Sequence, residues 1–356
     1  MMERIDSIDI FRGFAILQMI FWQIFDFFAR VDIYNDVPYY IPIFNMPIHG
    51  TGVAFFAFIS GTSAYIALSR KLNKNAREKD IIKHSIKRYG GYILLSLFFT
   101  TFVFGFKTFY TWNEAVQGIG FATLIAALVT LLLRSKFVLA ALSLAIILAQ
   151  PFLRQFIENS FVIQNFPESL ISFDIFSNAV SIFLNSAFRG FFSLSNLLPI
   201  ALFGIVLSHF LLEMNKTRVI KISLVVGMVF TLISIFLHFS INRIDYYNRS
   251  SSYLLFYIGL SFLLFSLIEF LLKKFKKNSI FDMLILFGKT SIVAYLVHYI
   301  FIYKLLSILK YESVLEPQIS YFLAIISIAA IYRICRIWLR NKQTVSNRIK
   351  SFFGNY

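Results

Sequence analysis

Apolar runs of about twenty residues recur along the whole chain, and no other feature constrains its fold as strongly. A helix needs about twenty apolar residues to cross a bilayer core. The 356 residues are 58% hydrophobic and 15% charged, and the 44 Phe residues are spread along the whole length. A soluble globular domain holds about 25% charged residues. The sequence therefore predicts an all-α, polytopic integral membrane protein.

Ten hydrophobic segments predict about ten transmembrane helices. They lie near 10–29, 51–69, 89–109, 117–133, 137–153, 191–212, 220–239, 252–272, 284–307 and 319–338. The first is too long for the apolar part of a signal peptide and lacks a small-residue cleavage site, so we expect it to be retained. We expect one transmembrane domain over 1–340 and a basic tail over 341–356.

Basic residues concentrate on alternate connections between these segments. The connection 70–88 alone carries eight. Together with the two termini, the connections on that side hold 25 of the 34 Lys and Arg residues, the opposite side holds eight, and Lys289 lies at the mouth of the ninth segment. Because cytoplasmic loops carry the excess of positive charge, both termini are predicted to be cytoplasmic. The net charge of +16 is then a topology signal, with anionic lipid head groups rather than nucleic acid as its partners.

The first segment carries a polar stripe. At 100° per residue, Asp9, Arg12, Gln23 and Asp26 lie on one helix face. Asp9 and Arg12 are three residues apart and can pair, and Gln23 lies about 16 Å deeper than Arg12. For the Asp9–Arg12 pair alone, an arginine that reaches the cytoplasmic surface with its counter-ion is an equally good interpretation. Gln23 and Asp26 on the same face favour a polar cavity or path.

The ninth segment, FGKTSIVAYLVHYIF (287–301), is the second place where ionisable groups enter the membrane. Read as one continuous helix, it has Ser291 and His298 on one face with Tyr295 beside them. His298 would lie about 14 Å inward from Lys289, at a depth comparable to that of Gln23. A core histidine hydrogen-bonded to a neighbouring helix is the simpler interpretation, and a functional histidine is the alternative.

The remaining candidates are few. His49, in MPIHGTGVAFFAFISG, lies at the outer mouth of the second segment beside small residues that allow close approach of a ligand. No spacing of His, Cys and carboxylates predicts a metal site, and the single cysteine, Cys335, excludes an internal disulfide. Of the outer connections, 31–50 is expected to be irregular, and about 154–190 is expected to hold a helix on or re-entering the surface.

The opening RIDSIDIFRGFAILQMIF resembles the R-x-x-S-[IV]-D-x-[FL]-R-G-x-A-[IL]-x-x-M-[IV] start of transmembrane acyltransferases. These are the heparan-α-glucosaminide N-acetyltransferase family and its prokaryotic relatives. GVAFFAFISGTS (52–63), EAVQGIGFATLI (114–125) and LLPIALFGIVLS (197–208) resemble its later spans, and GKTSIVAYLVHYIF (288–301) resembles its near-terminal G-x-x-S-[IL]-x-x-Y-x-x-H motif. The resemblance implies ten or eleven helices around an internal site.

The resemblance also implies acetyl transfer from cytoplasmic acetyl-CoA, or another acyl-CoA, to an amine or hydroxyl of a sugar or glycan at the far membrane face. No metal is expected. Two departures matter: Gln23 stands where relatives have His or Asn, and no His occurs within 31–48. Since Gln cannot be a general base, His298 and His49 are the candidate bases, with Asp26 third.

A mechanism that fits these residues places the donor phosphates at the cytoplasmic mouth and the thioester near mid-membrane. The catalytic candidates are His298, His49, Gln23 and Asp26. The candidate donor-binding residues are Arg12, Asp9, Lys289, Ser291, Lys87 and Arg88. A transporter with a polar intramembrane path and a catalytically inactive scaffold are the alternatives, a homodimer is compatible with the sequence, and the expected location is a prokaryotic plasma membrane.

Overall fold

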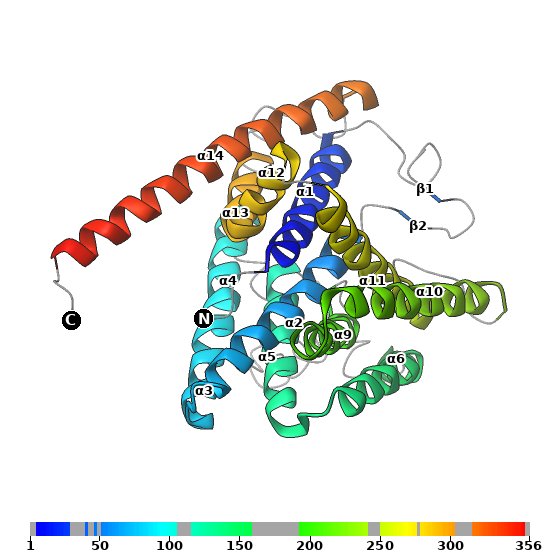
Figure 1. Cartoon of the computed structure of the whole chain (residues 1–356). Coiled ribbons are helices and arrows are strands. Elements are labelled where there is room, and N and C mark those ends of the chain that lie inside the picture. Colours follow the sequence, from blue (N-terminus) through cyan, green and yellow to red (C-terminus); the bar gives the residue numbers. More distant parts are fainter. Residues whose placement is uncertain are drawn as a thin grey trace, which may run out of the picture. The chain divides into compact units, whose positions relative to one another are not determined.

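The computed structural model describes most of the chain and is helical almost throughout (Figure 1). It describes residues 5–28, 40–41, 46–47, 51–104, 115–158, 192–240, 250–275, 278–302 and 315–352. The only extended pairing in these ranges is a two-residue ladder, in which β1 (Tyr40–Ile41) pairs antiparallel with β2 (Met46–Pro47). The predicted all-α class is confirmed.

The chain divides into two compact units, each of which is described by itself. Unit 1 comprises Tyr39–Leu271 with Met1–Glu3, and unit 2 comprises Arg4–Pro38 with Leu272–Tyr356. The helices of unit 1 are α2 (Thr51–Leu72), α3 (Glu78–Ser85), a π-helical turn (Ile86–Gly90), α4 (Gly91–Phe104), α5 (Ala115–Leu133), α6 (Lys136–Glu158), α9 (Leu194–Glu213), α10 (Lys216–Ser240) and α11 (Ser251–Lys274), whose last residues belong to unit 2. The helices of unit 2 are α1 (Asp6–Phe28), α12 (Ser279–Lys289), α13 (Ser291–Tyr299) and α14 (Pro317–Phe352).

Each of the ten predicted segments overlaps a helix among the described residues. Within the described ranges, seven helices are long and apolar enough to cross a membrane: α1, α2, α5, α9, α10, α11 and α14. The bent pair of α12 and α13 makes an eighth if it is one span. The apolar part of α6 and the described part of α4 are shorter. The chain is a multi-pass integral membrane protein.

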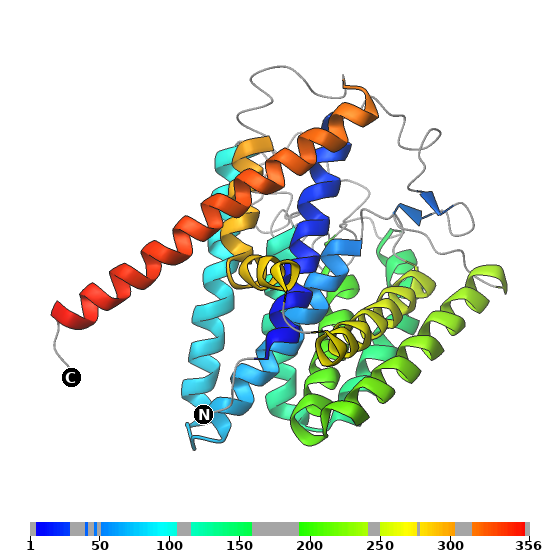
Figure 2. The ribbon, with the colours of Figure 1, turned by 45° about the horizontal axis from the view of Figure 1, so that its top comes forward.

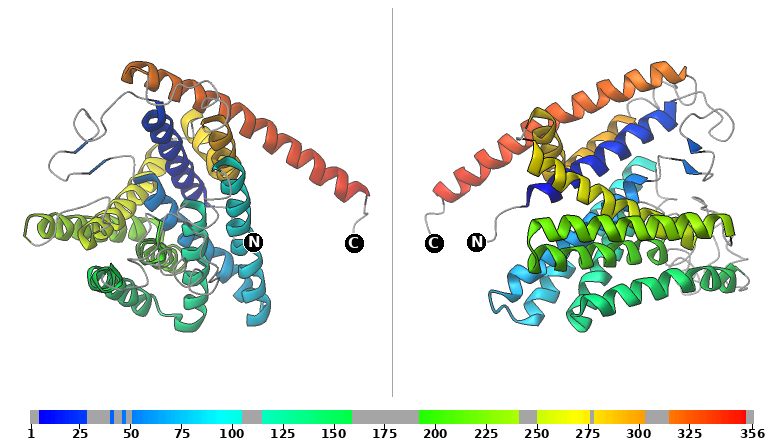
Figure 3. Two further views of the ribbon diagram at one scale, coloured as in Figure 1. Left: turned by 180° about the vertical axis from the view of Figure 1, so that it is seen from behind. Right: turned by 45° about the vertical axis from the view of Figure 1, so that its right-hand side comes forward.

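The core of unit 1 lies around α9, which is buried along most of its length. α2 crosses α9 at Gly61 and Gly204, and hydroxyl groups add hydrogen bonds between the helices. Thr62 Oγ1 donates to the Gly204 carbonyl at 3.0 Å, and Ser208 Oγ donates to the Thr62 carbonyl at 2.8 Å. α6 and α10 run alongside α9 in the right-hand view of Figure 3, and Ser143 Oγ ties α6 to the Pro199 carbonyl at 2.9 Å.

In unit 2, α14 packs against α1 through aromatic rings. The rings of Phe21 and Phe25 lie 5.8 and 4.7 Å from that of Tyr321. The Leu315 N–H donates to the carbonyl of Phe28, the last residue of α1, at 2.9 Å. α14 continues as one helix to Phe352, so most of the predicted basic tail is helical (Figure 2).

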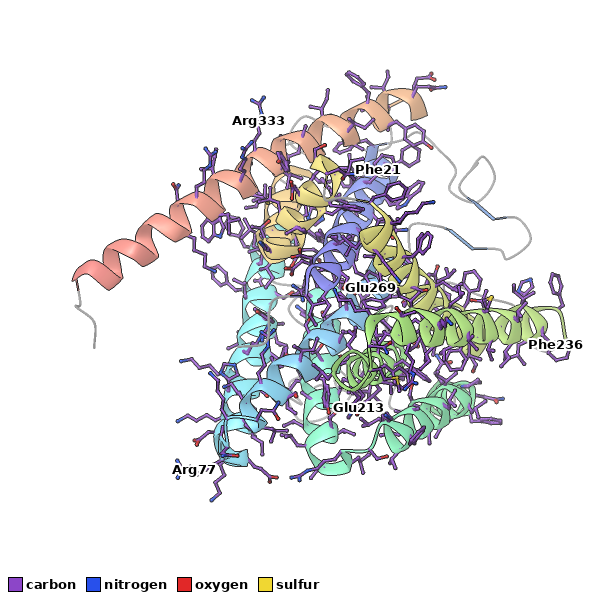
Figure 4. The ribbon with its side chains drawn as sticks, in the orientation of Figure 1. Phe21, Arg77, Glu213, Phe236, Glu269 and Arg333 are labelled. Atoms are coloured by element: carbon purple, nitrogen blue, oxygen red, sulfur yellow. The ribbon has the colours of Figure 1, made fainter. Side chains whose placement is uncertain are left out.

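Large apolar side chains point outward where a soluble protein would place charges. Phe236 on α10 is 66% exposed and projects from the helix, and Arg333 projects from α14 (Figure 4). Ile334 and Ile337 of α14 are also exposed. Exposed apolar side chains along helices of this length are stabilised by lipid contact. The expectation of a surface helix over 154–190 cannot be compared, because only the end of α6 up to Glu158 is described there.

Candidate functional site

The α1–α12 crossing in unit 2 brings the opening motif and the near-terminal motif together. A Cβ atom at Gly13 would lie 1.9 Å from the Leu284 carbonyl oxygen, and one at Gly288 would lie 1.9 Å from the Asp9 carbonyl oxygen. Each glycine therefore makes room for the backbone of the other helix. Small residues at helix crossings allow this close approach inside a membrane. The glycines of IFRG and LFGK are thus two halves of one packing contact.

Arg12 lies at this crossing. Its Nη1 donates to Asp9 Oδ1 at 3.3 Å and to the Gly288 carbonyl at 3.4 Å. The Arg12 side chain is 19% exposed and that of Asp9 only 4%. Gly288 belongs to the last turn of α12, whose carbonyls carry partial negative charge and lack helical partners. Arg12 therefore pairs with the buried Asp9 carboxylate, as predicted. It also offsets the partial negative charge at the end of α12.

The ninth predicted segment is not one straight helix. α12 ends at Lys289, α13 begins at Ser291, and their axes are bent by 79°. The prediction of a continuous helix was therefore wrong, and so was the depth of His298 calculated along it. Lys289 is exposed at the end of α12, next to the carbonyl that Arg12 contacts, whereas Ser291 is buried in the first turn of α13.

His298 contacts Gln23 across 275 residues of sequence. His298 Nε2 lies 2.5 Å from Gln23 Oε1, and Gln23 Nε2 donates to the Tyr299 hydroxyl at 3.4 Å. An amide oxygen only accepts hydrogen bonds, so in this arrangement His298 Nε2 carries the proton and Nδ1 keeps its lone pair. The sequence placed the two side chains at comparable depths, and the structure joins them directly.

Aromatic rings enclose this imidazole, which has no solvent exposure. The rings of Tyr295 and Tyr299 lie 5.0 and 4.6 Å from it, both edge to face. The Ala294 backbone lies beside the ring one turn earlier, yet His298 Nδ1 forms no hydrogen bond of ordinary geometry within the part of the chain described. The same holds for the buried Tyr295 hydroxyl. Buried polar atoms without partners cost free energy, which makes this spot a candidate for binding a polar group.

The structure joins Gln23 of α1 to His298 of α13, and separately joins Arg12 of α1 to Asp9 and to the Gly288 carbonyl of α12. Lys87 and Arg88 belong to unit 1, in the π-helical turn, where Arg88 lies 5.6 Å from the centre of the Tyr89 ring. The predicted sites at His49 and at the Asp26 side chain lie outside the described residues.

A second polar cluster, in unit 1, was not predicted. His209 Nδ1 on α9 lies 3.1 Å from both the Tyr65 hydroxyl and Glu213 Oε1, and its ring stacks on that of Tyr65 with centres 4.1 Å apart. Lys136 of α6 pairs with the other oxygen of Glu213. The spacing of His209 and Glu213 by one helical turn was the available signal. Among the described residues, no group of three or more His, Cys, Asp or Glu side chains is arranged to hold a metal ion.

A family model matches the N-terminal part of the chain. The family model described as heparan-alpha-glucosaminide N-acetyltransferase, catalytic, matches residues 4–176. The resemblance of the opening motif is confirmed. The match covers slightly less than half of the 356 residues and includes Asp9, Arg12 and Gln23 but not His298. It implies a membrane-bound N-acetyltransferase. A search of curated proteins finds no match.

Proposed function

We propose that the chain transfers an acetyl or other acyl group from cytoplasmic acyl-CoA to a sugar or glycan acceptor at the opposite membrane face. The observation that carries this proposal is the buried contact between His298 and Gln23. Gln23 lies on α1, the helix that also carries the Arg12–Asp9 pair. The family match over residues 4–176 supports the reaction class. Acyl transfer needs a base, a donor site and an acceptor site, and each has a candidate here.

We assign the donor phosphates to the end of α12 in unit 2, near Arg12 and Lys289. Arg12 and Lys289 supply positive charge on either side of the Gly288 carbonyl. α13 begins at Ser291, and the first N–H groups of a helix favour an anion. The sequence-based expectation that Lys87 and Arg88 also bind the donor stays a prediction. The thioester then reaches Gln23, about 16 Å along α1 from Arg12.

The base is assigned to His298. Its Nδ1 takes the proton from the attacking amine or hydroxyl while the new bond forms between that nitrogen or oxygen and the acyl carbon. The carbon–sulfur bond breaks, and the CoA thiolate receives the proton as His298 returns to its neutral form. Gln23 holds the ring in the tautomer that leaves Nδ1 free, as orienting groups do for other catalytic histidines. As a secondary role, the Gln23 amide is assigned to donate a hydrogen bond to the thioester carbonyl oxygen.

The remaining assignments follow the predicted topology. Both termini lie in the cytoplasm of a prokaryotic cell, residues 1–340 form the catalytic domain, and 341–356 form a basic tail. The expectation that His49 and Asp26 line the acceptor entrance stays a prediction. These positions would separate the donor, which enters from the basic side, from the acceptor, which enters from the other.

A transport function is the second candidate, and the break between α12 and α13 favours it. Interrupted helices beside a polar stripe are common in transporters, where the half-helix ends bind the substrate. Such a protein would move a polar solute past Gln23 and His298 without breaking a bond. An inactive scaffold remains the third candidate because Gln23 replaces the His or Asn of the relatives.

One set of variants separates these functions. The full-length chain is purified, and its thermal unfolding is measured with and without acetyl-CoA; thiol release is then followed with glucosamine as the probe acceptor. We expect acetyl-CoA to stabilise the wild type and His298→Gln, and we expect Arg12→Gln to lose most of that stabilisation. His298→Gln should lower turnover by about 10²–10⁴-fold, the usual contribution of a general base. His84→Gln, an exposed histidine on α3, is the matched control and should match the wild type.

Two results would contradict the proposal. If saturating acetyl-CoA does not stabilise the wild type, there is no donor site, and the transport function is favoured. If His298→Gln keeps full turnover while Arg12→Gln loses binding, the chain is an acyltransferase with a different base.

A further inference from the structure

The outward side of the α3–α4 segment carries an apolar stripe with four-residue spacing. Its members are exposed: Ile82, Ile86, Leu94, Phe98 and Phe102. α3, the π-helical turn and α4 follow one another without a break and form one column in Figure 2. A π-helical turn holds more residues than an α-helical turn, so residues four apart stay near one face through Ile86–Gly90. The lipid-facing stripe of α4 therefore continues into α3.

This continuation predicts that α3 lies at the membrane surface. Ile82 lies nine residues before Gly91, about 13 Å along the helix axis. The head-group layer on each side of the hydrocarbon core is only about 7 Å thick. Exposed isoleucines in α3 are stabilised where lipid covers them. We therefore expect the segment from α4 into α3 to pass through the head-group layer.

Lysines with the same spacing run beside the stripe. Lys79, Lys83 and Lys87 are exposed and form no ion pair within the described residues. The two acidic residues of α3 do not neutralise them, because Glu78 pairs with Arg134 and Asp80 pairs with Arg77. Three positive charges are thus left on the face that borders the lipid.

The pKa of the neighbouring His84 also responds to positive charges in this region. Burial is the main cause that lowers its pKa, and Lys71, Arg88 and Lys87 lower it further. Several cations act together on one exposed imidazole, although its own helix also holds two carboxylates. The positive charges around the C-terminal end of α3 are therefore not cancelled locally; Arg77, labelled in Figure 4, precedes the other end of the helix.

We propose that Lys79, Lys83, Ile82 and Ile86 form a binding face for the head groups of anionic phospholipids, which we call the α3 basic face. Ile86, about 7 Å along the axis from Gly91, contacts the acyl chains near the glycerol backbone, and the lysines contact the phosphates. The adjoining apolar stripe distinguishes a lipid from a free phosphate, which gains nothing from exposed isoleucine. This inference holds whether or not the chain transfers acyl groups.

The test uses the full-length chain in detergent and native mass spectrometry. Phosphatidylglycerol and phosphatidylcholine are titrated separately, and the retained lipid is counted for the wild type and for Lys79→Gln/Lys83→Gln. Each lysine near an anionic surface contributes about fivefold to affinity, so the double variant should bind phosphatidylglycerol about 25-fold more weakly. Lys216→Gln/Lys221→Gln removes the same charge from the start of α10 and is the matched control; it should bind nearly as the wild type does. Thermal unfolding in phosphatidylcholine checks that each variant is folded.

Three outcomes overturn the proposal. Equal retention of the two lipids by the wild type would show that no anionic head group is preferred. An equal loss in the control variant would show a general effect of net charge. Displacement of phosphatidylglycerol by an equal concentration of inorganic phosphate would show a site for soluble anions. A loss confined to Lys79→Gln/Lys83→Gln, reduced by added salt, supports the α3 basic face.

Discussion

Two helix crossings, α1–α12 in unit 2 and α2–α9 in unit 1, use the same packing device for different purposes. In each, two glycines face the backbone of the opposite helix. A Cβ atom would lie 1.9 Å from a carbonyl oxygen at Gly13, Gly288 and Gly204, and 2.0 Å from one at Gly61. The closeness of the backbones is therefore nearly identical in the two units.

The polar groups beside the glycines differ. Thr62 and Ser208 at the α2–α9 crossing donate only to backbone carbonyls, which holds the helices together without charge. At the α1–α12 crossing an arginine and an aspartate occupy the equivalent place, with the arginine partly exposed. Intramembrane charges are costly and mark function more often than stability. The comparison therefore supports the proposed donor site at the α1–α12 crossing, whereas the α2–α9 crossing shows only structural hydrogen bonds.

Each unit also holds a buried histidine bonded to a neighbouring helix. His209 faces a carboxylate, Glu213, which is itself paired with Lys136. His298 faces an uncharged amide, Gln23. A carboxylate partner stabilises the imidazolium form, whereas an amide partner fixes the tautomer without supplying charge. The two histidines therefore differ in the charge of their partners, and the proposed base, His298, has an uncharged one.

The largest effect is expected from filling the glycine contacts. Gly13→Ala and Gly61→Ala should each lower the free energy of unfolding by about 3 kcal/mol, because a backbone carbonyl cannot move aside as a side chain can. Gly91→Ala, whose Cβ would have no neighbour within 4 Å, is the control and should be neutral or slightly stabilising. Thermal unfolding gives the sizes, and hydrogen exchange should locate the loosening in α1 and α12 or in α2 and α9. Equal stability of Gly13→Ala and Gly91→Ala would rule out the close crossing.

The next effect concerns the support of His298. Gln23→Leu leaves the buried His298 Nε2–H without its acceptor, which costs about 1–3 kcal/mol of stability. Turnover should fall together with stability, because the ring is no longer held. Tyr299→Phe removes a hydroxyl that meets Gln23 at the longer distance of 3.4 Å and should have the smaller effect on both. If Gln23→Leu keeps normal turnover, Gln23 does not orient the base.

A smaller loss is expected at the uncharged crossing. Thr62→Val keeps the shape of the side chain but removes hydrogen bonds to two carbonyls, Phe58 and Gly204. We expect the free energy of unfolding to fall by about 1 kcal/mol and acyl transfer to stay unchanged. Chemical unfolding and thiol release measure the two quantities. A loss of turnover larger than the loss of stability would connect this crossing to catalysis and remove the distinction drawn here.

The smallest effect is expected at the second histidine. Glu213→Gln keeps an oxygen for His209 but removes the charge that pairs with Lys136. The Glu213 side chain is 45% exposed, so solvent screens the pair and the loss should be about 0.5 kcal/mol. Turnover should not change. A strong loss of turnover would move the catalytic assignment from His298 to His209.

Several features of the site were predictable because they depend on local spacing. Asp9 and Arg12 are three residues apart on a helix, so their pairing follows from helical geometry. His298, Tyr295 and Ser291 share the buried face of α13, as their spacing required. The residues around the break, Gly288, Lys289, Thr290 and Ser291, are small or polar and were the available signal, but the segment was read as one span because apolar residues flank them on both sides. The Tyr65–His209–Glu213 cluster was missed because the contacts of His209 with Tyr65 and of Glu213 with Lys136 join separate helices.

The sequence by itself determined that the chain is a helical membrane protein, where its helices lie, and that α1 carries a polar stripe. These properties depend on the length and period of apolar runs, which bilayer thickness and helix geometry dictate. Only the tertiary structure decided that Gly13 meets Leu284, that Gly288 meets Asp9, and that His298 meets Gln23. In lipid the hydrophobic effect does not select which helix faces pair, since buried and lipid-facing sides are equally apolar. Close packing of small residues and the pairing of buried polar groups make that choice, and both join residues more than 270 positions apart.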